Sequence, residues 1–186
     1  MHLSHLLLSL FFLSGFYYLG FKIINFFNLR NIVEKISEPF YQNTSFGLVS
    51  FIFIFYPIFF LGFFNYEFFL IISSSISLLG IINILININT ILNFLKRNLV
   101  KIKSYNKLDY IVYILLILFF LLSISPITSG DSISYHMGFA KYILKNGSFS
   151  KDLFFPEAPL AGAGEFLNAF ALSLKAYQFT SLINFV

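Results

Sequence analysis

Four long apolar runs constrain the fold of this chain more than any other feature of its sequence. They cover residues Leu3–Phe21, Phe46–Phe64, Phe68–Leu95 and Leu108–Ile124, and each approaches or exceeds the ~20 residues that a helix needs to cross a bilayer. The chain is 58% hydrophobic and 11% charged, against roughly 25% charged residues in soluble domains. The sequence therefore predicts an all-α, polytopic integral membrane protein with four transmembrane helices in residues 1–125.

The basic residues predict how these helices are oriented. Cytoplasmic links carry an excess of Lys and Arg. We therefore expect residues 28–45 and 96–107 in the cytoplasm, and the N-terminus and residues 126–176 on the outer side of the membrane, which the family resemblance described below implies to be a bacterial inner (plasma) membrane. The net charge of +4 reflects cations that flank membrane helices, so no nucleic-acid partner is expected. The basic residues of the two cytoplasmic links are Arg30, Lys35, Lys96, Arg97, Lys101, Lys103 and Lys107.

The third apolar run carries small and polar residues at steps of three and four, which places them along one helix face. Such a face lets a second membrane helix approach closely and hydrogen-bond to it. The pattern favours helix packing over a substrate groove, and the two asparagines are candidates for hydrogen bonds between helices. The residues of this face are Ser73, Ser77, Gly80, Asn83, Asn87 and Thr90.

After the fourth run, residues 126–136 bring together an acid, a histidine and several hydroxyl groups. Ionisable groups are costly near hydrocarbon, which makes this cluster at the mouth of a membrane helix a candidate functional site. Residues 132–145 have helical spacing with Lys141 and Lys145 on the polar face, and Gly147 supplies a helix stop. We expect this helix to lie in the plane of the membrane interface.

A second short helix is predicted at Phe166–Leu174, so that residues 126–176 form an external loop with two short interfacial helices. A fifth crossing would begin near Tyr177, and residues 177–186 supply only about half of the length it needs. We therefore expect the chain to be part of a longer protein and the 186 residues alone to be inactive.

The segment from about Leu108 to Val186 resembles the first large external loop of the GT-C glycosyltransferase superfamily. An Asp just past a membrane helix is followed by an interfacial helix and by a short helix that leads back into the membrane. Within the superfamily, the chain is similar to bacterial multi-spanning proteins of the dolichyl-phosphate-mannose mannosyltransferase-like type. It departs from the commonest arrangement because four helices, and not one, precede the acidic loop. The residues that carry the resemblance are Asp131, Tyr135, His136, Pro156, Pro159 and the run Gly164-Glu165-Phe166-Leu167.

The resemblance implies a polyprenyl-phosphate-linked sugar as donor, a sugar, lipid or protein as acceptor, and transfer on the outer face of the membrane. It implies Asp131 as the catalytic carboxylate, which would accept the proton of the acceptor hydroxyl. It also implies substrate binding by Tyr135, His136, Lys141 and Glu165. Lys141 and Lys145, or an Arg beyond residue 186, could offset the charge of the lipid phosphate. The loop lacks a pair of adjacent acids at its start, which leaves a divalent metal open as a cofactor.

Each of these residues also has a structural interpretation. Asp131 could cap the helix that follows it, and Glu165 could complement the dipole at a helix N-terminus. Tyr135 and His136 could anchor at the membrane interface, and Lys141 could face lipid headgroups. Two other functions therefore stay open, namely a non-catalytic membrane subunit or assembly factor, and a transporter or flippase fragment.

Overall fold

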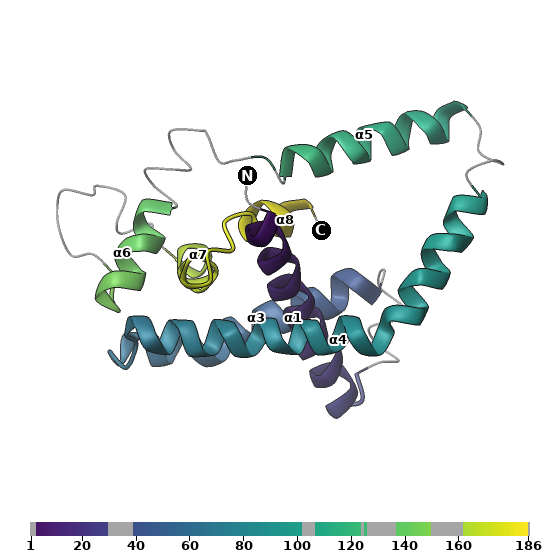
Figure 1. Ribbon diagram of the computed structural model, residues 1–186. Coiled ribbons are helices and arrows are strands. Elements are labelled where there is room, and N and C mark those ends of the chain that lie inside the picture. The colour runs from purple at the N-terminus through teal and green to yellow at the C-terminus, as the bar shows by residue number, and fades with distance from the viewer. Residues whose placement is uncertain are drawn as a thin grey trace.

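The computed structural model describes residues 3–29, 39–101, 107–123, 125, 137–149 and 162–185. All regular secondary structure in these ranges is helical, which confirms the predicted fold class. Figure 1 shows the described helices, which are α1 Leu3–Phe26, α3 Pro39–Phe60, α4 Tyr66–Lys101, α5 Lys107–Ser123, α6 Gly138–Asn146, α7 Ala163–Ser173 and α8 Phe179–Phe185.

The bounds of α3 differ from those of the predicted apolar run. The described part of the helix begins at Pro39, ahead of Phe46. It continues through Pro57 and ends at Phe60. Gly62 follows with φ 79°, a left-handed conformation that glycine adopts without strain. The hairpin loop to α4 therefore covers residues 61–65, whereas the gap between the second and third apolar runs predicted it at residues 65–67.

α4 begins at Tyr66 because Asn65 caps it. The Oδ1 atom of Asn65 accepts a hydrogen bond from the N–H of Phe68 at 2.8 Å, which satisfies one of the N–H groups that a helix start leaves without a partner. Glu67 lies in the first turn, where the helix dipole favours a negative charge. The cap residue Asn65 and the acidic Glu67 thus set the start of this helix, and the boundary of the apolar run does not.

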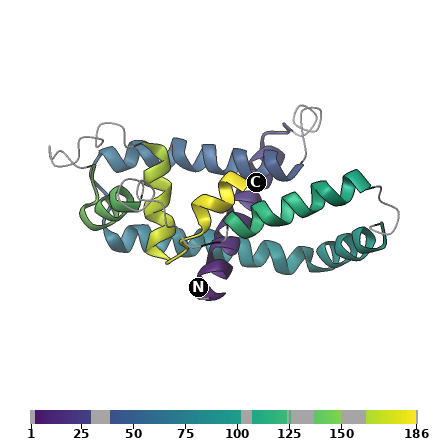
Figure 2. The ribbon, with the colours of Figure 1, turned by 90° about the horizontal axis from the view of Figure 1, so that it is seen from above.

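α1 crosses both α3 and α4 at points where glycines let the backbones touch (Figure 2). At the α1–α4 crossing, a Cβ atom on Gly80 would overlap the carbonyl oxygen of Phe11 and lie 2.8 Å from the nitrogen of Gly15. At the α1–α3 crossing, Gly20 and Gly47 leave equally little room for a Cβ. Small residues permit such close approach between membrane helices, so these glycines fix where the three longest helices meet.

Hydrogen bonds reinforce the α1–α4 crossing. The Nδ2 of Asn83 donates to the Oγ of Ser14 at 3.1 Å, and this hydroxyl donates to the carbonyl oxygen of Gly80 at 3.3 Å. Asn87 donates to the Oδ1 of Asn83 at 3.0 Å. The prediction that this face of α4 packs against another helix is confirmed as far as Asn83. The bonds of Asn87 go to Asn83 of its own helix, and Thr90 is exposed.

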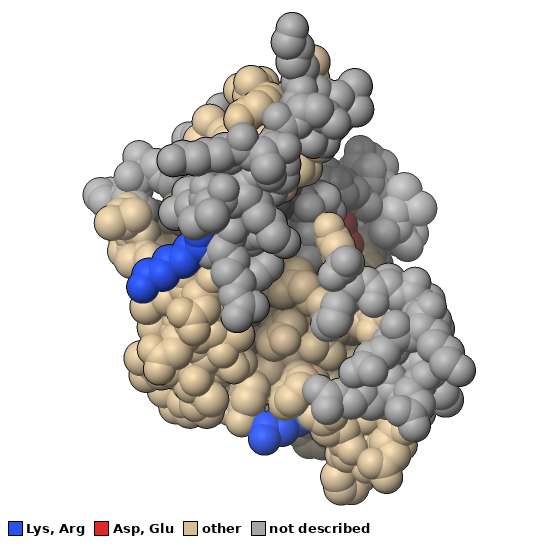
Figure 3. Space-filling model, turned by 90° about the vertical axis from the view of Figure 1, so that its right-hand side faces the viewer, with Lys and Arg blue, Asp and Glu red and all other residues tan. Residues whose placement is uncertain are grey.

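Three helices in the described part of the chain, α1, α3 and α4, are long and apolar enough to cross a membrane. Their outward side chains are apolar: Phe53 of α3 is 81% exposed and Ile86 of α4 is 66% exposed. The described part of the face in Figure 3 is mostly uncharged, with isolated Lys or Arg side chains. Because so large an apolar surface requires lipid around it, the protein is an integral membrane protein. The fourth predicted crossing, at α5, stays a prediction.

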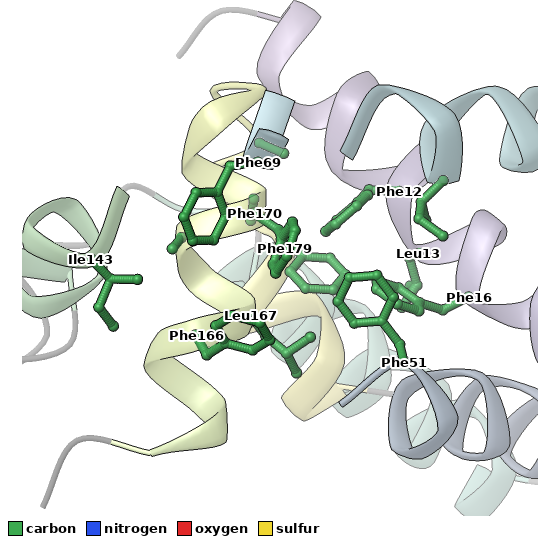
Figure 4. Close-up of a cluster of buried hydrophobic side chains, with 14 of the residues drawn as sticks. Phe12, Leu13, Phe16, Phe51, Phe69, Ile143, Phe166, Leu167, Phe170 and Phe179 are labelled. Carbon is green, nitrogen blue, oxygen red and sulfur yellow. The ribbon is translucent and has the colours of Figure 1, made fainter. Parts of the chain in front are cut away.

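Aromatic side chains form a core that joins the long helices to the short C-terminal ones (Figure 4). The ring centroids of Phe12 and Phe179 are 4.6 Å apart, and those of Phe69 and Phe170 are 4.7 Å apart. Such ring pairs add stability beyond that of their buried area. α7 and α8 are therefore integral to the fold. The fully buried phenylalanines of this core are Phe12, Phe16, Phe51, Phe69, Phe166, Phe170 and Phe179.

Candidate functional site

α6 and α7 lie at the hairpin end of α3 and α4 (Figure 1). A Cβ atom on Gly147, directly after α6, would overlap the carbonyl oxygen of Phe64 in the 61–65 hairpin loop. The ring of Phe149 lies 5.0 Å from that of Phe59. Gly147 has φ 64°, which confirms the predicted helix stop. We call this part of the protein the α6–α7 unit, which consists of residues 137–149 and 162–173.

α7 is buried along nearly its whole length. The Oγ of Ser73 in α4 donates to the carbonyl oxygen of Phe170 at 2.9 Å, and the Oγ of Ser173 donates to the Oγ of Ser73 at 3.0 Å. With 11 residues, α7 is about 16 Å long, which is too short to cross the ~30 Å of hydrocarbon in a bilayer. α7 is therefore a short helix that is held against α4 by both aromatic packing and hydrogen bonds.

Glu165 lies at the N-terminal end of α7 and is only 7% exposed. Its Oε2 accepts a hydrogen bond from the N–H of Gly162 at 2.8 Å, the arrangement of a capping box. The ring of Tyr56 in α3 packs on the ring of Phe166, the residue after Glu165, with the centroids 5.4 Å apart. The structure thus gives Glu165 the helix-terminal position that its structural interpretation requires.

α6 presents Lys141 and Lys145 on its outer side, one helical turn apart and both exposed. The opposite side, made of Phe139, Ala140 and Ile143, is buried. This side packs on the protein, where α6 is a neighbour of α7, and the predicted position of α6 in the membrane interface stays a prediction. Because α7 needs apolar cover, α6 uses its apolar side for the protein and turns its two positive charges outward.

Three predicted site residues, Asp131, Tyr135 and His136, lie outside the described residues. The other two, Lys141 and Glu165, both lie in the α6–α7 unit. Lys141 is exposed and Glu165 is buried, so the structure does not bring their charged groups together. Within the described ranges, no group of three His, Cys, Asp or Glu side chains could hold a metal ion. The catalytic role of Asp131 stays a prediction.

Two contacts that tie α8 to the rest of the protein were missed by sequence reasoning. The Oγ1 of Thr180 is hydrogen-bonded to the Oδ1 of Asn168 in α7, and Asn168 is 5% exposed. The ring of Tyr177 packs edge-on against His5 in α1, with the centroids 5.0 Å apart. Residue spacing reports which side chains share a face of one helix. It carries no signal for contacts between the two ends of a chain.

Comparison with known proteins gives one match. A family model described as the DUF1420 N-terminal domain matches residues 90–186, just over half of the chain. The match begins in the second half of α4 and includes every predicted site residue. No curated protein and no solved structure matches the chain. On the extent of the family match, the chain belongs to the DUF1420 family.

Proposed function

We propose that this protein is, or forms part of, a membrane glycosyltransferase that resembles the GT-C type and transfers a sugar from a polyprenyl-phosphate donor. The observation that carries the proposal is the position of the α6–α7 unit, which is held at the hairpin end of α3 and α4. In the predicted orientation this end faces outward, because the basic links 28–45 and 96–107 belong to the opposite end.

The residues of this region supply the chemistry that such a transfer needs. Asp131, which lies between α5 and α6 in the sequence, is the proposed general base for the acceptor hydroxyl. Lys141 and Lys145 are exposed side by side on α6 and can form charge-assisted hydrogen bonds to a lipid phosphate. Glu165 is the proposed positioning residue, because its carboxylate closes the start of α7.

Two alternative functions predict different behaviour. A transporter path along the polar face of α4 is disfavoured, because Ser73 and Asn83 are buried against α7 and α1 and are hydrogen-bonded to them. A non-catalytic subunit would use the α6–α7 unit as a docking surface. Such a subunit would need no carboxylate at Asp131.

The test is sugar transfer in membranes of cells that express the complete reading frame as the only source of the protein. Radiolabelled polyprenyl-phosphate mannose and glucose serve as donor probes. Asp131→Asn should abolish transfer while the expression level stays near that of the unmodified protein. Asn caps a helix about as well as Asp, so this variant removes the base and preserves any cap.

Asp131→Ala removes both base and cap, and comparing it with Asp131→Asn separates the two tasks. If the Asn variant is fully active and the Ala variant is poorly expressed, Asp131 is only a helix cap. That outcome would overturn the catalytic role of Asp131 and remove the main residue-level support for the enzyme. Absence of sugar transfer by the unmodified protein would overturn the glycosyltransferase proposal and favour the non-catalytic subunit.

A further inference from the structure

α5 differs from every other described helix in having apolar side chains on all sides and almost no protein around it. Its residues from Tyr110 to Leu122, apart from Phe120, are between 43% and 66% exposed. Phe120 packs on the core, and α8 is a neighbour of α5. A helix that is hydrophobic all round must be surrounded by an apolar medium, and the protein covers only one side of it.

The course of the chain requires an element that runs back along α4. α4 leaves the hairpin loop at Tyr66 and ends 36 residues later at Lys101. The end of α6 is again at the hairpin loop, because Gly147 touches the carbonyl of Phe64. Figures 1 and 2 agree that α5 runs back from the far end of α4 toward the side of α6 and α7. α5 is the described helix between those two points.

The residue types of α5 indicate what surrounds it. Between Tyr110 and Leu122 there is no Gly, Ala, Ser, Thr or Asn, the residues with which membrane helices pack against one another. By contrast, α1 uses Ser14, Gly15 and Gly20 at its crossings. A helix that lay flat on the membrane surface would need a polar face, and α5 has none. Both a partner helix and an interfacial position are therefore disfavoured.

We infer that α5 is a fourth membrane crossing that contacts lipid acyl chains around most of its circumference and returns the chain to the hairpin side. Its described apolar part is Tyr110–Ser123, and the apolar run Leu108–Ile124 that contains this part has 17 residues, the lower end of the roughly 17–25 that crossing helices use. Tyr110 and Tyr113 near its start suit the membrane interface. The inference is independent of any catalytic role.

Because the chain has no tryptophan, a single introduced Trp reports unambiguously on its surroundings. The full chain carrying Ile111→Trp, Leu116→Trp or Leu122→Trp is reconstituted into phosphatidylcholine vesicles whose acyl chains are brominated at defined depths. All three positions are exposed. All three Trp variants should be quenched, with Leu116→Trp closest to the bilayer centre and the other two nearer the opposite interfaces.

Two control variants calibrate the measurement. Phe53→Trp, at an exposed site in α3, should be quenched, and Phe166→Trp, at a site with 0% exposure, should not. Equal shallow depths along α5 would show an interfacial helix and overturn the crossing. Protection of Leu116→Trp to the level of Phe166→Trp would show a protein partner, such as a second copy, and overturn the contact with lipid.

Discussion

A single methyl group at Gly80 should separate α1 from α4. A Cβ there would lie 2.8 Å from the nitrogen of Gly15 and overlap the carbonyl of Phe11. Ordinary contacts between nonbonded atoms are about 3.5–4.0 Å, so the helices must move apart by roughly 1 Å. Overpacking of this kind costs about 1–3 kcal/mol. Loss of the bond from Asn83 to Ser14 adds about 0.6 kcal/mol, the typical value inside membranes.

The two losses add up to about 1.6–3.6 kcal/mol, and the higher helix propensity of Ala offsets up to about 1 kcal/mol of this. We therefore expect Gly80→Ala to lower the free energy of unfolding by roughly 1–3 kcal/mol, measured by SDS titration in mixed micelles with far-UV circular dichroism. The matched control is Gly164→Ala in α7, where a new Cβ would meet nothing within 4 Å. The control should leave stability unchanged or raise it, because Ala favours helix by up to about 1 kcal/mol over Gly.

A double variant tests the reasoning more sharply. Gly15→Ala would clash with Ile76 at the same crossing, so once one methyl has separated the helices, the second should cost little. We expect Gly15→Ala and Gly80→Ala together to destabilise by clearly less than the sum of the single effects. Equal stability of Gly80→Ala and Gly164→Ala would refute the close approach of α1 and α4.

Three further substitutions probe the α6–α7 unit. Ser73→Ala removes the hydrogen bonds to Phe170 and Ser173, so it should lower the free energy of unfolding by about 0.6–1.7 kcal/mol and speed deuterium uptake in α7. The control is Ser75→Ala, which should change neither, because the hydroxyl of Ser75 donates to Ile71 in its own helix. Glu165→Ala should lower the free energy of unfolding by ~0.3–1.5 kcal/mol, whereas Glu165→Gln should lower it less, because Gln keeps an oxygen that can accept the bond from the N–H of Gly162. Equal losses in the two variants would argue against a capping role for Glu165. The double variant Lys141→Gln/Lys145→Gln should leave the unfolding curve unchanged and raise the KM for the lipid-linked donor. Lys22→Gln on α1 is the control and should change neither quantity. An unchanged KM in the double variant would refute the proposed contact between these lysines and the lipid phosphate.

The sequence predicted the helices well because their causes are local. Apolar runs of bilayer length fixed α1, α3 and α4, and the spacing of Ser73, Gly80 and Asn83 correctly indicated a packing face. The helix starts were predicted less well. The described part of α3 already includes Pro39, ahead of its apolar run, and α4 starts directly after its cap Asn65, within the residues 65–67 that separate the second and third runs.

What could not be predicted depends on contacts between distant segments. The apolar face of α6 could not be assigned a protein partner from residue spacing alone. The partner is α7, which is itself buried because Phe170 packs against Phe69 of α4. The candidate site was predicted only from local chemistry and resemblance. Of its residues, the structure places Lys141 outward and Glu165 at a helix start, and Asp131 lies outside the described residues.

The side of the membrane on which the α6–α7 unit lies tests the proposed external transfer most directly. The chain has no cysteine, so Ser148→Cys and Ser104→Cys each introduce a single thiol. Ser148 follows α6 and is exposed, and Ser104 lies in the basic link 96–107. In intact cells, an impermeant maleimide should label the thiol at position 148, and it should label that at position 104 only after the membrane is permeabilised. Labelling at 104 and protection at 148 would place the α6–α7 unit in the cytoplasm and contradict sugar transfer on the outer face.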